Sequence, residues 1–180
     1  MSNGRIILLN GTSSAGKTTL AKALRAALPE PFCYYALDQL ADAGFRTIKH
    51  VARHVGKPNE RARFFDGFHR SIAAFADAGN DLIVEHIVEE QSWADQLQAL
   101  LAHLDTFWIG VHAPAAELER REKVRGDRSV GEAVFHLKTH GYCRYDIEVD
   151  TTEPADIVAA AIVDAWRRRP GGTQTTAESI

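Results

Sequence analysis

Apolar runs and helical patterns alternate along the chain, and this alternation is the first clue to the fold. Four runs of aliphatic or aromatic residues have the length and composition of strands that are covered on both faces. They lie in residues 5–10, 32–36, 81–88 and 106–112, and a fifth strand is expected at residues 146–149. Strands that alternate with helices predict an α/β fold of three layers, α/β/α, around a five-stranded parallel sheet with right-handed crossovers.

Helical periodicity fills the segments between the strands. We predict helices over residues 18–28, 59–78, 92–102 and 154–168, and a further helix that begins at Pro114. The longest helix places four apolar residues at spacings of three and four: Phe64, Phe68, Ile72 and Phe75. Gly79 is expected to end this helix, Ser92 to cap the next one, and Pro114 to occupy a first-turn position, where proline is tolerated.

The segment between the first strand and the first helix matches a phosphate-binding loop without substitution. Residues 11–18 fit the pattern G-x-x-x-x-G-K-[ST], and strand, loop and helix follow in the order that this motif requires. Glycines allow the backbone to wrap a phosphate chain with its N–H groups pointing inward. Lys17 can reach the β- and γ-phosphates of ATP, and the Thr18 hydroxyl can hold Mg²⁺. The expected nucleotide-binding residues are Gly11, Thr12, Ser13, Ser14, Ala15, Gly16, Lys17, Thr18 and Thr19.

Asp38 follows the second predicted strand, at the end of the sheet where ligands bind in such folds. A carboxylate there can orient an attacking hydroxyl and accept its proton during phosphoryl transfer. Asp is also a favoured N-cap residue, and Asp38 could equally cap a helix that starts at Gln39. Position alone does not separate these two interpretations.

Glu85 ends the apolar run of the third predicted strand, and His86 follows it. A carboxylate at this point can hold Mg²⁺, directly or through water. The alternative is a structural Glu paired with a cation or a hydroxyl, and we favour the metal site because an unpaired buried carboxylate is costly. His86, Glu89 and Glu90 could line the acceptor pocket, although Glu89 and Glu90 could also form an acidic approach to the next helix.

Charged residues concentrate in residues 120–128. Together with the central glycine they predict a mobile lid, over about residues 114–140, whose arginines close over the triphosphate. Glu117 and Arg121 have the favourable i,i+4 order of an ion pair on a solvated helix, so part of the cluster is structural. The two arginines that flank the Gly-Asp pair are the predicted catalytic arginines: Arg125 and Arg128.

Composition sets modest bounds on function. The chain of 180 residues suits one domain, expected over residues 1–170, with a disordered polar tail at 171–180. A net charge of −3 argues against a generally cationic nucleic-acid binder. No window approaches the ~18 apolar residues of a membrane span, and we expect no signal peptide. The eight histidines show no metal-binding spacing, and the two cysteines, without such a spacing either, suggest a reducing compartment, the cytoplasm.

Several segments resemble the chloramphenicol phosphotransferase family. Residues 10–17 resemble the Gly-rich S-S-A-G-K loop of that family, and Leu-Pro-Glu-Pro recurs after the first helix. Residues 104–111 resemble its fourth strand. The more specific matches are Arg-Gly-Asp-Arg at residues 125–128 and Tyr-Asp-Ile-Glu-Val-Asp-Thr-Thr at residues 145–152, which resemble its lid and its last strand. The resemblance extends from the first strand to about Thr152 and is weakest between positions 45 and 75.

This resemblance implies an ATP-dependent kinase of small hydroxylated molecules with an adenylate-kinase-like P-loop fold. The catalytic Asp of the family matches Asp38, and its lid arginines match Arg125 and Arg128. Two departures concern the acceptor site. Paired acidic residues of the family are replaced here by Glu85 and His86, and the segment that would line the acceptor pocket is shorter and more basic, with Arg46, Lys49, His50, Arg53 and His54. A more polar or anionic acceptor therefore competes with a neutral aryl diol.

We therefore predict an enzyme that moves the γ-phosphate of ATP, with Mg²⁺, to a hydroxyl of a small molecule, as in the inactivation of chloramphenicol. A metabolic kinase of a sugar, nucleoside or hydroxy acid is an alternative within the same enzyme class. A nucleotide-binding regulatory ATPase without a small acceptor is the alternative outside that class. A GTPase switch would need a guanine-reading N-K-x-D motif, and the chain has none.

Overall fold

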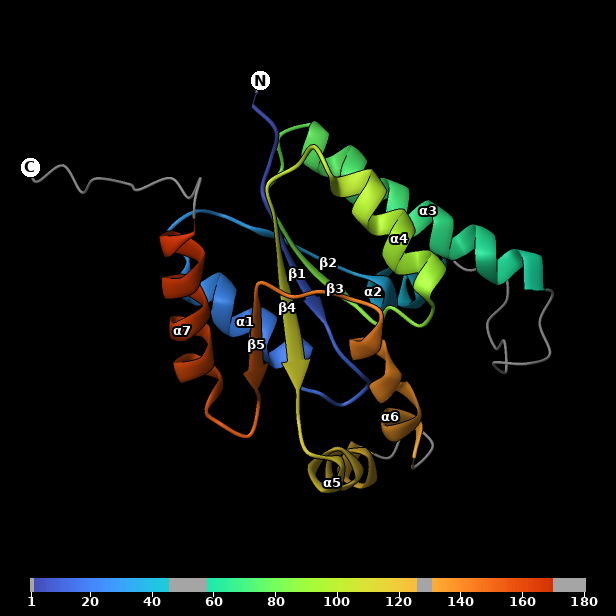
Figure 1. The fold of residues 1–180 in the computed structure, drawn as a ribbon, viewed down its shortest axis with the longest axis vertical. Helices are drawn as coiled ribbons and strands as arrows, with labels where there is room; N and C mark the ends of the chain where they lie inside the picture. The colour runs from blue at the N-terminus through green and yellow to red at the C-terminus, as the bar shows by residue number, and fades with distance from the viewer. Residues whose placement is uncertain (1, 46–57, 126–130, 170–180) are drawn as a thin grey trace, which may run out of the picture.

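In the computed structural model, which describes residues 2–45, 58–125 and 131–169, five strands form one parallel sheet (Figure 1). Their order across the sheet is β2-β3-β1-β4-β5. The predicted five-stranded parallel sheet is confirmed, with strand ends displaced by at most one or two residues. The strands are β1 (Ile6–Asn10), β2 (Cys33–Ala36), β3 (Leu82–His86), β4 (Thr106–His112) and β5 (Ile147–Asp150).

Helices cover both faces of the sheet, which gives the three predicted layers (Figure 1). One face packs against α1 (Lys17–Ala27) and α7 (Ala155–Arg168). The other face packs against α3 (Pro58–Asp77) and α4 (Gln91–Leu101). The shorter elements follow strand ends or the lid segment: α2 (Leu37–Asp42), α5 (Ala115–Arg125), α6 (Glu132–Phe135) and the 3₁₀ helix η1 (His136–Gly141).

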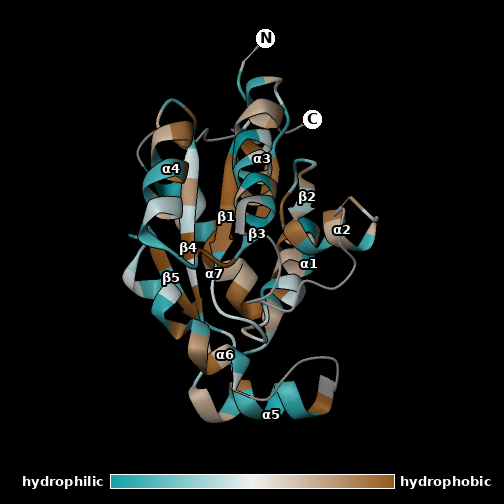
Figure 2. Cartoon of the chain, turned by 90° about the vertical axis from the view of Figure 1, so that its right-hand side faces the viewer, coloured by the Kyte–Doolittle hydropathy of each residue, from teal (hydrophilic) through white to brown (hydrophobic). Residues whose placement is uncertain are grey.

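The central strand β1 contributes to both hydrophobic cores. Ile7 and Leu9 pack with the core under α1 and α7, while Ile6 and Leu8 pack with the core under α3 and α4. All four side chains are fully buried. Because successive side chains of a strand point to opposite faces, an uninterrupted apolar run supplies both cores. Figure 2 shows this apolar strand enclosed by helices that carry much of the hydrophilic surface.

Each predicted helix start is displaced by one residue, and the predicted roles of Ser92 and Pro114 change as a result. The helix α4 begins at Gln91 with Glu90 as its N-cap residue, so Ser92 lies inside the first turn, where its hydroxyl donates to the Glu90 carboxylate. Pro114 and Pro154 each precede their helices, and each carbonyl group accepts a hydrogen bond from the N–H group four residues on. Proline suits this position because the residue before a helix does not need to donate its own N–H group.

Candidate active site

One large cleft lies at the carboxyl ends of the strands. Its volume is about 1260 Å³. The cleft runs from the phosphate loop past α2 and the end of β3 to the start of α3, and α5 and the loop after β5 line its other side. Sites for single small ligands have volumes of about 300–1,000 Å³. The cleft therefore has room for a nucleotide and a small acceptor together.

Close backbone contacts shape the phosphate loop. Gly11 cannot carry a side chain, because an added Cβ would lie 2.4 Å from a carbonyl oxygen of β4. Gly16 has a φ of 89° and Ser14 a φ of 59°, both in the left-handed region that a tight loop requires. The Lys17 side chain is buried, and its Nζ donates to the carbonyl oxygens of Gly11 at 2.9 Å and Thr12 at 2.7 Å.

Thr18 and Glu85 meet beside the phosphate loop. The Thr18 hydroxyl lies 3.1 Å from Glu85 Oε1 and 3.0 Å from Oε2, and the Tyr34 hydroxyl donates to Oε2 at 2.5 Å. Burial first, and then the Glu85 carboxylate, raise the pKa of Tyr34 above its usual value, so this hydroxyl stays protonated at neutral pH.

The chemistry of this pair fits Mg²⁺ held jointly with substrate. Mg²⁺ in phosphotransfer enzymes takes only one or two protein oxygens, and substrate phosphates and water supply the rest. A hydroxyl and a carboxylate in contact at the end of a phosphate loop match that requirement. Within the part of the chain that the structure describes, no three His, Cys, Asp or Glu side chains gather as a metal site of their own.

Asp38 lines the cleft from the first turn of α2. Its interpretation as an N-cap residue is wrong, because α2 begins at Leu37 and Ala36 is the N-cap residue. The Ala36 N–H group donates to the side chain of Gln39 at 2.9 Å, so the side chain that bonds to the backbone at the start of α2 is Gln39 and not Asp38. The negative charge of Asp38 contributes to the raised pKa of Tyr34. Asp38 and Tyr34 therefore line the same cleft, and Asp38 does not act as a helix cap.

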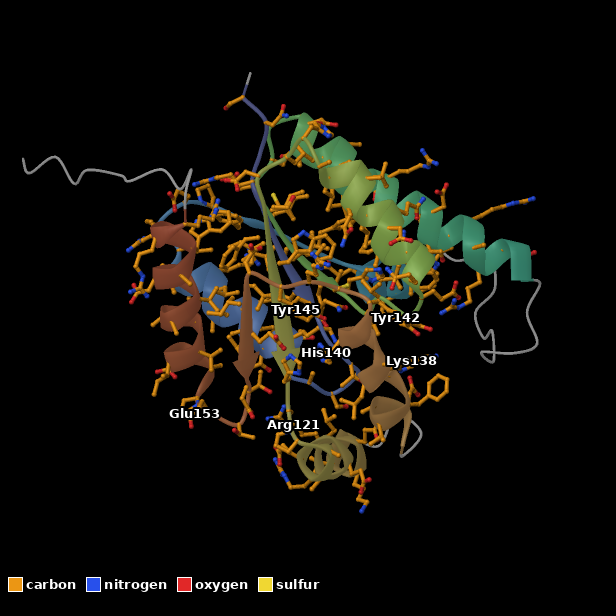
Figure 3. All side chains as sticks on the ribbon, viewed as in Figure 1. Arg121, Lys138, His140, Tyr142, Tyr145 and Glu153 are labelled. Atoms are coloured by element: carbon orange, nitrogen blue, oxygen red, sulfur yellow. The ribbon has the colours of Figure 1, made fainter. Side chains whose placement is uncertain are left out.

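Arg121, which the sequence pattern assigned to a surface ion pair, lies against the phosphate loop. It keeps the predicted pair with Glu117, at 2.7 Å, and its guanidinium also donates to the carbonyl oxygen of Ser14 at 3.2 Å. Further hydrogen bonds run to the hydroxyl and carbonyl oxygens of Thr151, at 2.9 and 2.7 Å. Figure 3 shows Arg121 rising from α5 toward the ends of β4 and β5, and Arg121 lines the cleft. The neighbouring Arg120 is exposed and pairs with Glu117.

The predicted catalytic arginines fall largely outside the described residues. Arg125 is the last residue of α5, and its side chain and the whole of Arg128 lie outside them. Their roles stay predictions. The basic residues expected along the acceptor pocket also lie outside the described residues: Arg46, Lys49, His50, Arg53 and His54.

Buried polar contacts tie the segment after α5 to the phosphate loop. Glu122 of α5 is fully buried, and its carboxylate accepts hydrogen bonds from the N–H groups of Gly131 at 2.8 Å and Ala133 at 2.6 Å. These donors belong to the start of α6, where helical N–H groups have no partner within the helix. The Thr12 hydroxyl donates in turn to the carbonyl oxygen of Ala133. The helices α6 and η1 were not predicted from the sequence.

Asn10 links the end of β1 to η1. Its Oδ1 accepts hydrogen bonds from the Val88 N–H group at 2.9 Å and the Thr139 hydroxyl at 3.1 Å, and its Nδ2 donates to the Tyr145 hydroxyl at 2.7 Å. The Tyr145 hydroxyl and His140 Nδ1 are 3.0 Å apart, and Figure 3 shows the two side chains close together. Burial, followed by nearby ionisable groups, lowers the pKa of His140 to about 4, so the ring is neutral at physiological pH.

Two buried histidines lie in contact next to Glu85, and one of them, His86, lines the cleft. The Gln96 amide donates to the Asp66 carboxylate at 2.5 Å, so its carbonyl oxygen accepts from Nδ1–H of His69 at 2.7 Å. His69 Nε2 is then the acceptor for Nε2–H of His86, at 2.9 Å. Burial lowers the pKa of both rings, which agrees with two neutral histidines. The hydrogen-bond chain thus fixes the tautomer of His86, which lines the cleft.

Glu89 and Glu90, whose roles the sequence left open, have different contacts. Glu90 is the N-cap residue of α4, whereas the Glu89 carboxylate pairs with Arg61 at 2.8 Å. The Arg61 guanidinium also lies 4.6 Å from the ring centre of Phe65 and 5.0 Å from that of Trp93. Arg61 and Glu89 both line the cleft. The ion pair with Glu89 therefore compensates the positive charge that Arg61 brings to the cleft wall.

Comparison with known families decides the class of this protein. The model of the family described as chloramphenicol phosphotransferase-like protein matches residues 4–167. The chain belongs to this family. A relative from Mycobacterium tuberculosis (strain ATCC 25618 / H37Rv), named "Putative O-phosphotransferase Rv2636", is 28% identical over 194 residues, which cover 94% of this chain and 85% of the relative. The predicted family and enzyme class are confirmed, and the chain is an ATP-dependent O-phosphotransferase.

Solved structures share the fold at low sequence identity. The APS kinase CysC of Mycobacterium tuberculosis, in complex with AMPPNP and APS, is 18% identical with a TM-score of 0.66, and the match covers 92% of this chain and 98% of that one. The tunicamycin resistance protein of Deinococcus radiodurans is 21% identical with a TM-score of 0.62, over 89% and 94% of the two chains. These likenesses confirm the predicted P-loop kinase fold. None of the described helices is long and apolar enough to cross a membrane.

Arg121 and Arg120 provide a matched pair of substitutions. Arg121→Ala should weaken binding of the ATP analogue AMPPNP by about tenfold, because it removes a charge from the cleft and a donor from the loop carbonyl. Arg120→Ala removes only an exposed ion pair and should stay within about twofold. Isothermal titration calorimetry measures both. Equal losses in the two variants would mean that Arg121 acts only through the ion-pair network of α5.

The buried His86 should make stability depend on pH. Its pKa is well below 6.5 in the folded chain, so the unfolded chain binds a proton that the folded chain does not. Stability is therefore retained above pH ~6.5 and lost progressively below it. His86→Asn should reduce the slope of unfolding free energy against pH, between pH 6.5 and 5, by up to about 1.4 kcal/mol per pH unit. Urea unfolding at several pH values measures this slope. Identical slopes for the unchanged chain and for His86→Asn would contradict a lowered pKa of His86 in the folded chain.

Proposed function

We propose that this phosphotransferase passes the γ-phosphate of ATP directly to a hydroxyl group of a small molecule, with Asp38 as the base and with Thr18 and Glu85 as the residues that hold Mg²⁺. The observation that supports this proposal is that one cleft is lined by Lys17, the Thr18–Glu85 pair and Asp38. Lys17 and Thr18 come after β1, Glu85 lies near the end of β3, and Asp38 comes directly after β2. These three strands are neighbours in the sheet.

In this proposal the nucleotide is held by the phosphate loop and by the positively charged side chains of Lys17 and Arg121. The N–H groups of residues 11–18 wrap the phosphates, and Lys17 exchanges its loop carbonyl partners for β- and γ-phosphate oxygens. Arg121 adds a second positive charge beside the loop. Thr18 and Glu85 would hold Mg²⁺, which would supply positive charge against the negative charge that develops on the phosphates during transfer. The predicted lid arginines Arg125 and Arg128 would add to that neutralisation.

The transfer itself needs a positioned hydroxyl and a proton acceptor. The acceptor oxygen forms a bond to the γ-phosphorus, the bond from that phosphorus to the β–γ bridging oxygen breaks, and ADP leaves. The hydroxyl proton passes to the Asp38 carboxylate, which lines the cleft at the end of β2. Positioning and charge neutralisation account for most of the catalysis in such reactions, so the fixed strand ends are the main contribution of the fold.

The described acceptor side of the cleft favours a molecule with an apolar face next to its hydroxyl. Phe45 and Phe64 both line it, with ring centres 6.4 Å apart, and the charge of Arg61 is compensated by Glu89. Chloramphenicol, after which the family is named, is therefore the first acceptor to test, ahead of sugars, nucleosides and hydroxy acids. We expect the enzyme in the cytoplasm, where free cysteines stay reduced.

The decisive experiment is turnover of Mg·ATP against a panel of acceptors. The panel contains chloramphenicol, other hydroxylated antibiotics, nucleosides, sugars and hydroxy acids, and mass spectrometry identifies the phosphorylated product. Transfer to one of these acceptors supports the proposal and names the substrate. Slow hydrolysis of ATP that no acceptor stimulates would contradict it and favour a regulatory ATPase.

Asp38→Asn should separate binding from catalysis. Loss of the general base should lower kcat by about 100-fold or more, while the affinity for ATP stays unchanged. Asp42→Asn is the matched control, because Asp42 lies one turn further along α2 and also lines the cleft. This control should keep nearly full activity. If Asp38→Asn retained normal transfer, or if both variants lost it equally, Asp38 would not be the base.

A further inference from the structure

Tyr34 reaches the cleft from the interior of an edge strand. In the pairing of β2 with β3, Ala36 lies opposite Glu85, and Tyr34 lies opposite Ile83, two residues earlier. Two residues of a strand span about 6.6 Å. A tyrosine is long enough to cover that distance along the strand, and its hydroxyl arrives at the Glu85 carboxylate, 2.5 Å from Oε2.

Side chains alternate between the two faces of β2, so its two tyrosines have different surroundings. The side chain of Tyr34 shares its face with Ala36, which is small, and packs against the core under α1 and α7. Tyr35 points to the opposite face, where its ring packs against Phe68 and its hydroxyl bonds with Ser71 at 2.7 Å. Only Tyr34 of this pair lines the cleft.

The hydrogen bond from Tyr34 makes the two oxygens of Glu85 unequal. The Thr18 hydroxyl lies almost equally far from both oxygens, at 3.1 and 3.0 Å, and so does not select an orientation. Tyr34 donates to Oε2 alone, so Oε2 has two neighbouring donors and Oε1 has one. A phenylalanine would fill the same core space without orienting the carboxylate.

We propose that Tyr34 is a positioning residue for magnesium, which holds Glu85 Oε2 and so presents Oε1 to the metal ion or to its bound water. This inference rests on the proposed function, in which Thr18 and Glu85 hold Mg²⁺. Tyr34 does not touch the reacting atoms. It acts through Glu85, and its contribution appears only when the metal is present.

The test compares Tyr34→Phe with Tyr35→Phe by isothermal titration calorimetry, using AMPPNP with excess Mg²⁺ and AMPPNP with EDTA. Tyr34→Phe should weaken binding of the magnesium complex by about tenfold, the size expected for a hydrogen bond to a charged group. It should leave binding in EDTA unchanged. Tyr35→Phe should change neither. In turnover, Tyr34→Phe should raise the Mg²⁺ concentration for half-maximal rate and leave kcat at saturating Mg²⁺ nearly normal.

A double-mutant cycle with Glu85→Gln shows whether the effect passes through the carboxylate. In the Glu85→Gln background, Tyr34→Phe should have no further effect on magnesium-dependent binding. Full additivity would overturn the inference, as would equal losses with and without Mg²⁺ or equal losses in the two tyrosine variants. If the unchanged chain bound AMPPNP no better with Mg²⁺ than with EDTA, the proposed metal site itself would fail. Magnesium-dependent binding that Tyr34→Phe leaves intact would overturn only the role of Tyr34.

Discussion

The carbonyl groups of the phosphate loop are the constraint on which much of this structure depends. A loop that turns its N–H groups inward to bind phosphate must satisfy its carbonyl groups with donors from elsewhere. A buried carbonyl without a donor costs about 1–3 kcal/mol. The chain supplies these donors from side chains: Lys17 for Gly11 and Thr12, Arg121 for Ser14, and the Thr151 hydroxyl for Ala15.

These donors explain the positions of elements that are far from the loop in sequence. Arg121 brings α5 against the loop, and Thr151 brings the turn after β5 against it. Thr12 makes a further bond, to the carbonyl oxygen of Ala133 in α6. The described residues on both sides of positions 126–130 thus contact the phosphate loop, through Arg121 of α5 and through Ala133 of α6.

The central place of β1 in the sheet divides the cleft into two sides. The strands β3 and β2 lie on one side of it and bring Glu85 and Asp38, the acidic groups of the proposed transfer. The strands β4 and β5 lie on the other side, with Arg121 and Thr151 at their ends. Since parallel strands all end at the same edge, Glu85, Asp38 and Arg121 line one cleft around the phosphate loop.

The sequence by itself determined the features that short windows encode. The phosphate loop, the alternation of strands and helices and the five strand positions depend on local spacing, and the structure confirms the sheet they predict. Helix starts were less certain, because Ser92 and Asp38 are good N-cap residues that this fold does not use as caps.

Only the tertiary structure decided which of several similar residues reach the cleft. The sequence assigned Arg121 to a surface ion pair and gave no sign that Arg121, and not Arg120, contacts the phosphate loop. It does not separate Tyr34 from Tyr35 either, since the two have the same chemistry at adjacent positions. The bond from Arg121 to Ser14 joins residues 107 positions apart, and the bond from Tyr34 to Glu85 joins residues 51 positions apart. Such contacts follow from strand order and register, which bring together distant segments, and local periodicity carries no information about either.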